Sequence, residues 1–164
     1  MREFKIVKGD LIKLAKQGEF DVIAHGCNCF NTQKSGIAAQ MVKAFGTDKF
    51  LMERKSKGNI NKLGLIDKIR FDLGDNNYSL TVVNMYTQHR YGRNHADGDV
   101  NPLDYEALTL CLRKLNHSFK GKHIGLPKVG AGLAGGDWNR IREIIKSELR
   151  DCDVTIVEYT KMSE

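Results

Sequence analysis

Residues 21–40 (DVIAHGCNCFNTQKSGIAAQ) restrict the possible folds more than any other part of the chain. Residues 21–25 form an apolar run typical of a buried strand, and a polar turn with two thiols and two asparagines follows. Gly36 then opens a segment with helical spacing of apolar residues. A strand that feeds a helix through such a loop directs unpaired backbone N–H groups and the positive end of the helix dipole toward one point. We therefore expect this loop to bind an anion.

A second stretch repeats this arrangement near the C-terminus. Residues 124–129 read as a buried strand, residues 130–136 (GAGLAGG) as a loop almost without side chains, and Asp137 as the start of an amphipathic helix. Bare backbone approaches a phosphate more closely than a loop that carries side chains. Two such loops predict a ligand with two phosphates, or one diphosphate gripped from both sides.

The order of the elements predicts an α/β fold. Strands are expected at residues 4–7, 21–25, 63–71, 78–86, 124–129 and 154–159, and helices at 11–15, 37–45, 47–57, 103–115 and 137–149. Strands separated by helices form a mostly parallel sheet covered on both faces, a three-layer α/β/α arrangement, and the hairpin before residue 86 makes the sheet mixed. Ligands of such sheets bind beyond the carboxyl ends of the strands. The loops after residues 24, 86 and 129 should therefore meet at one edge.

Composition is that of an ordinary globular protein. With 164 residues, 41% of them hydrophobic, and no low-complexity tract, the chain is expected to form one domain over residues 1–164. The N-terminus lacks the apolar run of a signal peptide or membrane anchor, and the four cysteines include no CxxC pair. We therefore expect a cytoplasmic protein with no membrane partner. The net charge of +6 lies largely in residues 54–62 and 113–122, which read as solvated faces because neither alternates aromatic side chains with its charges.

Four motifs occur along nearly the whole chain: residues 8–11 (KGDL), residues 21–28 (DVIAHGCN) followed by GIA, residues 127–133 (PKVGAGL), and a closing strand that ends in Tyr159. In this order and at these spacings they resemble the macro domain, the ADP-ribose-binding module. Within this family the chain resembles the ADP-ribose-1''-phosphate phosphatase branch and the related terminal ADP-ribose glycohydrolase branch. The residues that carry this resemblance are the motif HGCNC at 25–29, the Tyr86-Thr87 turn and Asp104-Tyr105.

The resemblance implies a role for each matching position. Asp10 would accept a hydrogen bond from the adenine amino group, and the Leu11 N–H would offer a second contact. Asn28 would hold hydroxyls of the distal ribose, and Tyr159 would pack near the adenine. The backbone N–H groups that wrap the diphosphate would come from Gly36, Ile37, Gly130, Gly132 and Leu133. The predicted substrate-binding set also includes Lys34, Tyr86, Gln88, Ala131 and Ala134.

The sequence departs from the family's pattern at three positions. Lys34 stands where the family usually has a glycine, and it either strengthens the grip on a second anionic group or faces water. Gln88 aligns with the lysine that attacks in the glycohydrolase branch, and Ala134 with an aspartate of that branch. We therefore do not expect a covalent lysine mechanism.

The candidate catalytic residues are His25, Asn28 and Asp137. His25 or Asp137 would move the proton while Asn28 orients the ribose. Each has a structural alternative, because His25 fits a hydrogen-bonded core position and Asp137, like Asp10, fits a helix N-cap.

Other chemistries fit the residues less well. His25, Cys27 and Cys29 match no common zinc spacing, so no metal is expected, although a loop helix could lower a thiol pKa and make either cysteine a nucleophile. Residues 130–135 satisfy a dinucleotide fingerprint, but only one strand follows them, which disfavours a nicotinamide dehydrogenase.

The sequence therefore predicts a protein that binds ADP-ribose derivatives and hydrolyses a bond at the distal ribose without a cofactor. The foremost substrate is ADP-ribose-1''-phosphate, cleaved to ADP-ribose and phosphate. Removal of ADP-ribose from protein or nucleic-acid adducts is an alternative. The competing class is a binding module that recognises ADP-ribose and catalyses no reaction. Its basic surface would then bind nucleic acid or an acidic partner.

Overall fold

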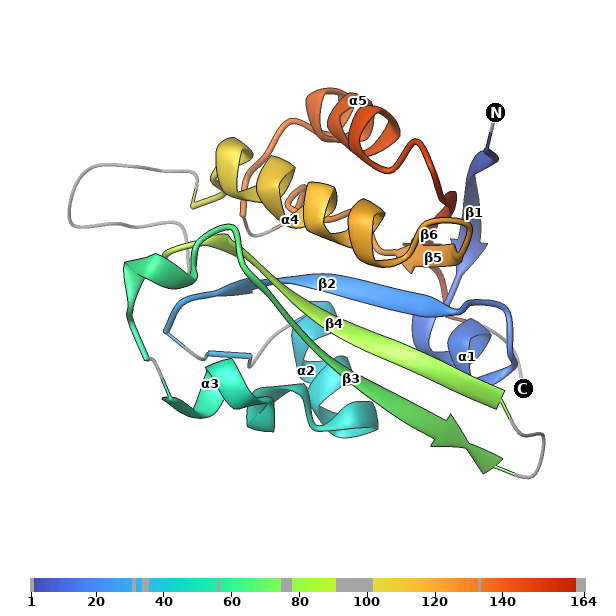
Figure 1. Ribbon diagram of the computed structural model, residues 1–164, viewed down its shortest axis with the longest axis horizontal. Coiled ribbons are helices and arrows are strands. Elements are labelled where there is room, and N and C mark those ends of the chain that lie inside the picture. Colours follow the sequence, from blue (N-terminus) through green and yellow to red (C-terminus); the bar gives the residue numbers. More distant parts are fainter. Residues whose placement is uncertain are drawn as a thin grey trace.

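The computed structural model of the chain describes residues 2–30, 32–33, 36–55, 57–74, 78–90, 102–132 and 134–161. One six-stranded sheet crosses the molecule in the order β1-β6-β5-β2-β4-β3 (Figure 1). Its strands are β1 (Phe4–Gly9), β2 (Val22–Asn28), β3 (Ile66–Leu73), β4 (Tyr78–Gln88), β5 (His123–Leu126) and β6 (Asp153–Tyr159). All neighbours pair in parallel except β3, which runs antiparallel to β4. The predicted mixed, mostly parallel sheet is confirmed.

Helices cover both faces of this sheet. They are α1 (Leu11–Lys16), α2 (Gly36–Phe45), α3 (Leu51–Lys55), α4 (Tyr105–Ser118) and α5 (Trp138–Glu148), with short 3-10 turns η1 (Thr47–Lys49) and η2 (Ile60–Lys62). Helices α4 and α5 lie on one face, and α1, α2 and α3 on the other (Figure 1). The three-layer α/β/α architecture predicted from the element order is therefore confirmed. No helix in the described ranges is both long and apolar enough to cross a membrane.

The central strand β2 is buried on both faces. Val22 and Ala24 join the apolar cluster under α4 and α5, whereas Ile23 between them joins the cluster under α1 and α2. A slip of one residue would exchange these faces, so burial fixes the register. Burying one such aliphatic side chain contributes about 1.5–3 kcal/mol. This fixed register sets where the strand ends, at the edge where a ligand would bind.

Three helices begin at capping aspartates, and two of these caps, Asp10 and Asp137, are predicted from the sequence. The carboxylate of Asp10 accepts from the N–H groups of Ile12 and Lys13, at 3.0 and 3.1 Å. Asp104 and Asp137 cap α4 and α5 in the same way. The structural alternative for Asp10 and Asp137 is thus confirmed, since each satisfies N–H groups that a helix cannot satisfy itself.

Several elements have bounds that differ from the expected ones, and two of these differences have a clear physical cause. The helix predicted at residues 47–57 is wrong, because Phe50 is extended (φ −62°, ψ 156°) between η1 and α3 and turns its ring into the core at 2% exposure. Strand β2 does not end at His25 but continues to Asn28, because residues 26–28 pair with β4 through a register shift between Cys27 and Asn28. These polar residues belong to the strand, and the loop starts after them.

Candidate active site

A cavity of about 560 Å³ opens at the carboxyl ends of β2, β4 and β5. Its lining is Gly26, Cys27, Asn28, Thr32, Gln33, Gly36, Ile37, Ala38, Thr87, Gln88, Pro127, Lys128, Val129, Gly130, Gly132 and Ala134. A second cavity of about 270 Å³ lies toward β1 and β6, where Leu11, Gln40, Val157 and Tyr159 line it. Four residues line both cavities: Gly36, Ile37, Pro127 and Lys128. The two loops therefore meet over one elongated cleft, as the parallel sheet predicts.

The first turn of α2 forms one wall of the shared region. Gly36 starts this helix with φ +58°, a left-handed conformation that favours glycine. The first N–H groups of a helix have no partner within the helix and carry its positive end charge. The turn can therefore supply N–H groups to an anion in the cleft.

The glycine loop after β5 forms the facing wall. Gly130 has φ +74°, and the Gly136 N–H donates to its carbonyl at 2.7 Å, which closes the loop on itself. A Cβ on Gly130 would come within 2.9 Å of the Leu103 side chain, so packing excludes a larger residue there. Gly132 differs, because a Cβ there would meet no atom of the described residues within 4 Å. The fold needs glycine at 130, whereas at 132 only a ligand close to the backbone would need it.

Asn28 shapes the other end of the cleft. Its side-chain oxygen accepts from the N–H groups of Phe30 and Thr32 at 2.8 and 3.3 Å, and its amide donates to the Thr32 carbonyl at 2.8 Å. An amide nitrogen carries two hydrogens, so one donor remains for a ligand hydroxyl. Thr87 and Gln88, at the end of β4, complete this wall.

Two curated relatives match almost the whole chain. An uncharacterized 17.5 kDa protein of Enterobacteria phage T4 is 33% identical over 162 residues, which cover 94% of this chain and 96% of the relative. An ADP-ribose 1''-phosphate phosphatase of Meyerozyma guilliermondii is 27% identical over 165 residues, which cover 89% of this chain and 94% of that enzyme. No family model matches the chain.

Solved structures share the fold over nearly the full length. The macrodomain of Mycobacterium tuberculosis DarG superposes with a TM-score of 0.71 at 18% identity, covering 96% of this chain and 98% of that one. The chain has the fold of the macro domain family. A Trypanosoma brucei macrodomain in complex with ADP-ribose superposes over 96% of this macro domain and 63% of that chain, with a TM-score of 0.59 at 15% identity.

His25 does not line the cleft of this macro domain. It is fully buried, and its Nε2 lies 2.7 Å from the Oδ1 of Asn84, whose amide donates to the Thr47 carbonyl at 3.0 Å. Since the Asn84 oxygen can only accept, Nε2 carries the proton. Burial lowers the pKa of His25 from 6.5 to about 4, so the ring is neutral at pH 7. The prediction that His25 moves a proton at the substrate is therefore corrected, and its core alternative describes the position.

The buried neutral ring predicts a pH dependence of stability. Below pH 6.5 the unfolded chain takes up a proton on His25 that the folded chain accepts only near pH 4, so stability falls as the pH falls through this window. The full effect is about 3 kcal/mol. Urea unfolding of the wild type and of His25→Gln should give a difference in free energy that shrinks toward pH 4. A difference that stays constant from pH 7 to pH 4 would contradict a neutral buried ring.

The other predicted site residues fall into three groups. Gly36, Ile37, Gln88, Gly130, Gly132 and Ala134 line the larger cavity, and Leu11 and Tyr159 the smaller one. Asp10, Tyr86, Ala131 and Asp137 line neither. Lys34 and Leu133 lie outside the described residues.

Four predicted site residues do not line either cavity, and their burial or their place in the fold explains why. Tyr86 is fully buried in a cluster with Cys27 and Cys29, and burial raises its pKa. The prediction that Tyr86 contacts the ligand is therefore corrected, because it is a core residue. Asp137 is exposed, caps α5 and lines neither cavity, so its predicted role at the substrate stays a prediction. Ala131 packs against the core under α4 and α5. Asp10 stays beside the smaller cavity through its neighbour Leu11.

Neither thiol of the strand-end loop suits nucleophilic attack. Cys27 and Cys29 are buried, and burial raises the pKa of Cys27 well above 9.0 and that of Cys29 to about 11. Both are therefore protonated near pH 7, whereas a nucleophile needs the thiolate. Within the described ranges, no group of three or more His, Cys, Asp or Glu side chains could hold a metal ion.

The sequence argument missed part of the lining. Thr32, Gln33, Gln40, Thr87 and Lys128 contribute polar groups to the cleft. Lys128 is the second residue after β5, and its Nζ lies 3.4 Å from the Glu158 carboxylate. The signal that could have identified Lys128 is its place between a buried strand and the glycine loop, at the carboxyl edge of the sheet.

Proposed function

We propose that this macro domain binds ADP-ribose derivatives along the two joined cavities. The observation that carries the proposal is the wall common to both cavities, formed by the first turn of α2 and the segment that leads into the glycine loop. A diphosphate there would meet backbone N–H groups from two sides. The adenosine would lie in the smaller cavity beside Leu11 and Tyr159, and the distal ribose beside Asn28.

The chemistry that we propose first is hydrolysis of ADP-ribose-1''-phosphate. Water would attack the phosphorus, the bond between phosphorus and the sugar oxygen would break, and that oxygen would take up a proton, giving ADP-ribose and phosphate. The relative named as an ADP-ribose 1''-phosphate phosphatase supports this choice at 27% identity. Catalysis would come mainly from positioning, with Asn28, Thr87 and Gln88 around the reacting end.

A second candidate is a reader that binds ADP-ribose without turnover. The described lining of the two cavities contains neither a histidine nor a carboxylate. A general acid or base, where one acts, is usually one of these side chains. This composition favours slow chemistry or binding alone.

One assay set separates these functions. The protein is incubated with ADP-ribose-1''-phosphate, ADP-ribosylated protein and ADP-ribosylated DNA, and the release of phosphate or free ADP-ribose is followed. Phosphate release from the first substrate alone supports the phosphatase, and release of ADP-ribose from either adduct selects the alternative hydrolase. Saturable binding of ADP-ribose without any turnover selects the reader.

Asp10→Ala should weaken binding of ADP-ribose about tenfold, because the carboxylate would no longer accept from the adenine amino group. The same change removes the cap of α1 and should lower stability by about 1 kcal/mol. Asp10→Ser keeps a capping oxygen but shortens the side chain, so it should bind as weakly as Asp10→Ala while remaining more stable. Calorimetry and thermal unfolding measure the two effects, and unchanged affinity in both variants would exclude the adenine contact.

A further inference from the structure

A groove lies between helix α4 and the edge strand β3, away from the cleft. Its volume is about 420 Å³, and its lining is Ile66, Lys68, Arg113, Lys114, His117 and Ser118. None of these residues lines either cavity of the ADP-ribose cleft. The groove is therefore a separate surface with its own chemistry.

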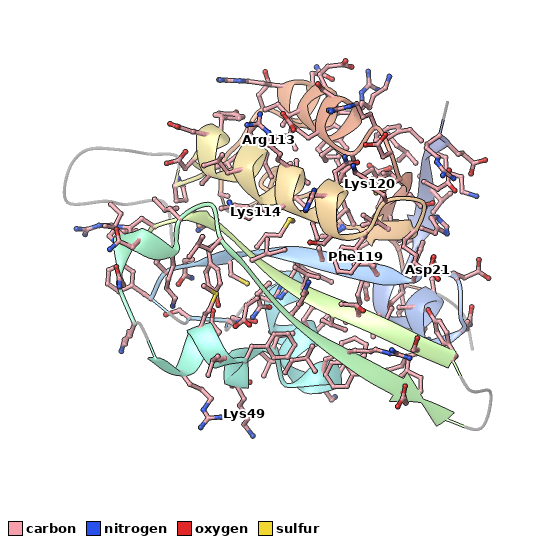
Figure 2. All side chains as sticks on the ribbon, viewed as in Figure 1. Asp21, Lys49, Arg113, Lys114, Phe119 and Lys120 are labelled. Atoms are coloured by element: carbon pink, nitrogen blue, oxygen red, sulfur yellow. The ribbon has the colours of Figure 1, made fainter. Side chains whose placement is uncertain are left out.

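Both walls of the groove carry cations. On β3, Lys68 and Arg70 alternate onto the same face as Ile66, which packs against the core under α4. On α4, Lys114 lies on the side toward β3 and Arg113 on the side toward α5 (Figure 2). Folding thus brings the basic stretch at residues 113–122 next to Lys68, which the sequence places more than 40 residues earlier.

Most of this positive charge is not neutralised. Arg113 forms a paired contact with Glu148, at 3.0 and 3.2 Å. Lys114 instead donates to the Gly64 carbonyl at 2.9 Å, and the Lys68 Nζ lies 5.2 Å from the centre of the Phe119 ring. Neither a carbonyl nor a ring cancels the charge of an ammonium group. Within the described parts of the chain, Lys68 and Lys114 form no ion pair with a carboxylate.

Acidic residues of the same two elements lie away from the groove. The Asp67 carboxylate accepts from the Met52 N–H at 2.8 Å, on the opposite face of β3. Glu106 is in the first turn of α4. Asp72 shares the face of Lys68 and Arg70, but it is near the far end of β3 and does not line the groove. The groove therefore presents a net positive field to solvent.

The cations lie along the groove rather than around one point. Lys68 and Arg70 repeat after two strand residues, about 6.6 Å. Lys114 lies on the other wall, on α4. A single anion would be held by converging donors, whereas cations spread along both walls of an open groove suit a chain of phosphates. We propose that the groove between α4 and β3 binds the backbone of single-stranded nucleic acid without reading its sequence.

Fluorescence anisotropy with a labelled, unmodified oligothymidylate of about 20 nucleotides tests the proposal. Binding should weaken steeply between about 50 and 200 mM salt, because each neutralised phosphate releases a counterion. Lys68→Glu/Lys114→Glu should raise Kd at least about tenfold and reduce the slope of log K against log salt by about 1.4. Lys68→Glu/Arg70→Glu should act similarly and leaves the hydrogen bond from Lys114 to Gly64 intact, should the first variant fail to fold.

The matched control is Lys43→Glu/Lys49→Glu, which changes the net charge by the same amount. Both residues are exposed on α2 and η1, on the opposite face of the sheet, where Figure 2 shows Lys49. This variant should keep its Kd within about threefold of the wild type. Equal losses in both double variants would overturn the proposal, since total charge would then explain the binding. So would binding without salt dependence, tighter binding of a duplex, or equally strong competition by polyglutamate, which would indicate an acidic protein as partner. The test needs no ADP-ribose, so its outcome is independent of the cleft's function.

Discussion

Gly132→Val should bind ADP-ribose at least about tenfold more weakly than the wild type while unfolding at nearly the same temperature. Gly132 lines the larger cavity, and its φ lies outside the left-handed region. Among the residues that the structure describes, a Cβ there would meet no atom within 4 Å, so we expect the fold to tolerate a side chain. The valine methyl groups would, however, occupy the place of a diphosphate bound against this backbone, so the ligand could not bind there. Loss of one charge-assisted hydrogen bond costs about 1.5–3 kcal/mol, or roughly 10- to 100-fold in Kd.

Calorimetry with ADP-ribose and thermal unfolding of the same samples measure both halves of this prediction. Ala131→Ser is the control in the same loop, because Ala131 packs against the core and lines neither cavity. Its affinity should stay within about twofold, since no ligand contact changes. Wild-type affinity in Gly132→Val would mean that the diphosphate does not lie against this loop.

Gly136→Ala should have the opposite consequence, a large loss of stability. A Cβ on Gly136 would come within 2.7 Å of both the Gly130 carbonyl oxygen and the Ile141 side chain, with Leu103 also in the way. A backbone carbonyl cannot move without opening the loop, which the Gly136 N–H closes at the same oxygen. Overpacking of this kind costs about 3 kcal/mol, which lowers the midpoint of thermal unfolding by roughly 6–12 °C in a chain of this size.

Urea unfolding measures this cost, and Gly132→Ala is the matched control in the same loop. The control should unfold within about 0.5 kcal/mol of the wild type, because its Cβ enters open space. The double variant Leu103→Ala/Gly136→Ala should lose less than the sum of the single variants, because a smaller residue at 103 relieves part of the overlap. A Gly136→Ala protein as stable as the wild type would contradict the packing under the loop.

Local patterns predicted most of the fold. The apolar run at residues 21–25 predicts the start of β2, and Gly46 marks the end of α2. Both patterns depend only on residues within or next to the element that they predict. The break at Phe50 and the extension of β2 to Asn28 were not predictable in this way. Phe50 leaves the helical path to bury its ring, and residues 26–28 become strand only because β4 lies beside them. Both outcomes depend on distant parts of the chain.

The meeting of the two loops at one cleft could be predicted from the sequence, whereas the places of several side chains could not. The loops at Gly36 and Gly130 meet because parallel strands end at one edge, which the order of the elements already implies. His25 was misplaced although a signal existed: it has the same strand parity as Ile23, which packs toward α1 and α2. Its partner Asn84 lies on another strand and could not be identified from spacing.

The measurement that tests the cleft most directly is calorimetric titration of the intact protein with ADP-ribose. We predict saturable binding of one molecule per chain with a Kd on the order of 10 μM, and weaker binding of adenosine monophosphate, which cannot span both cavities. Absence of heat at millimolar ADP-ribose, or equal affinity for the monophosphate, would contradict a cleft built for the diphosphate.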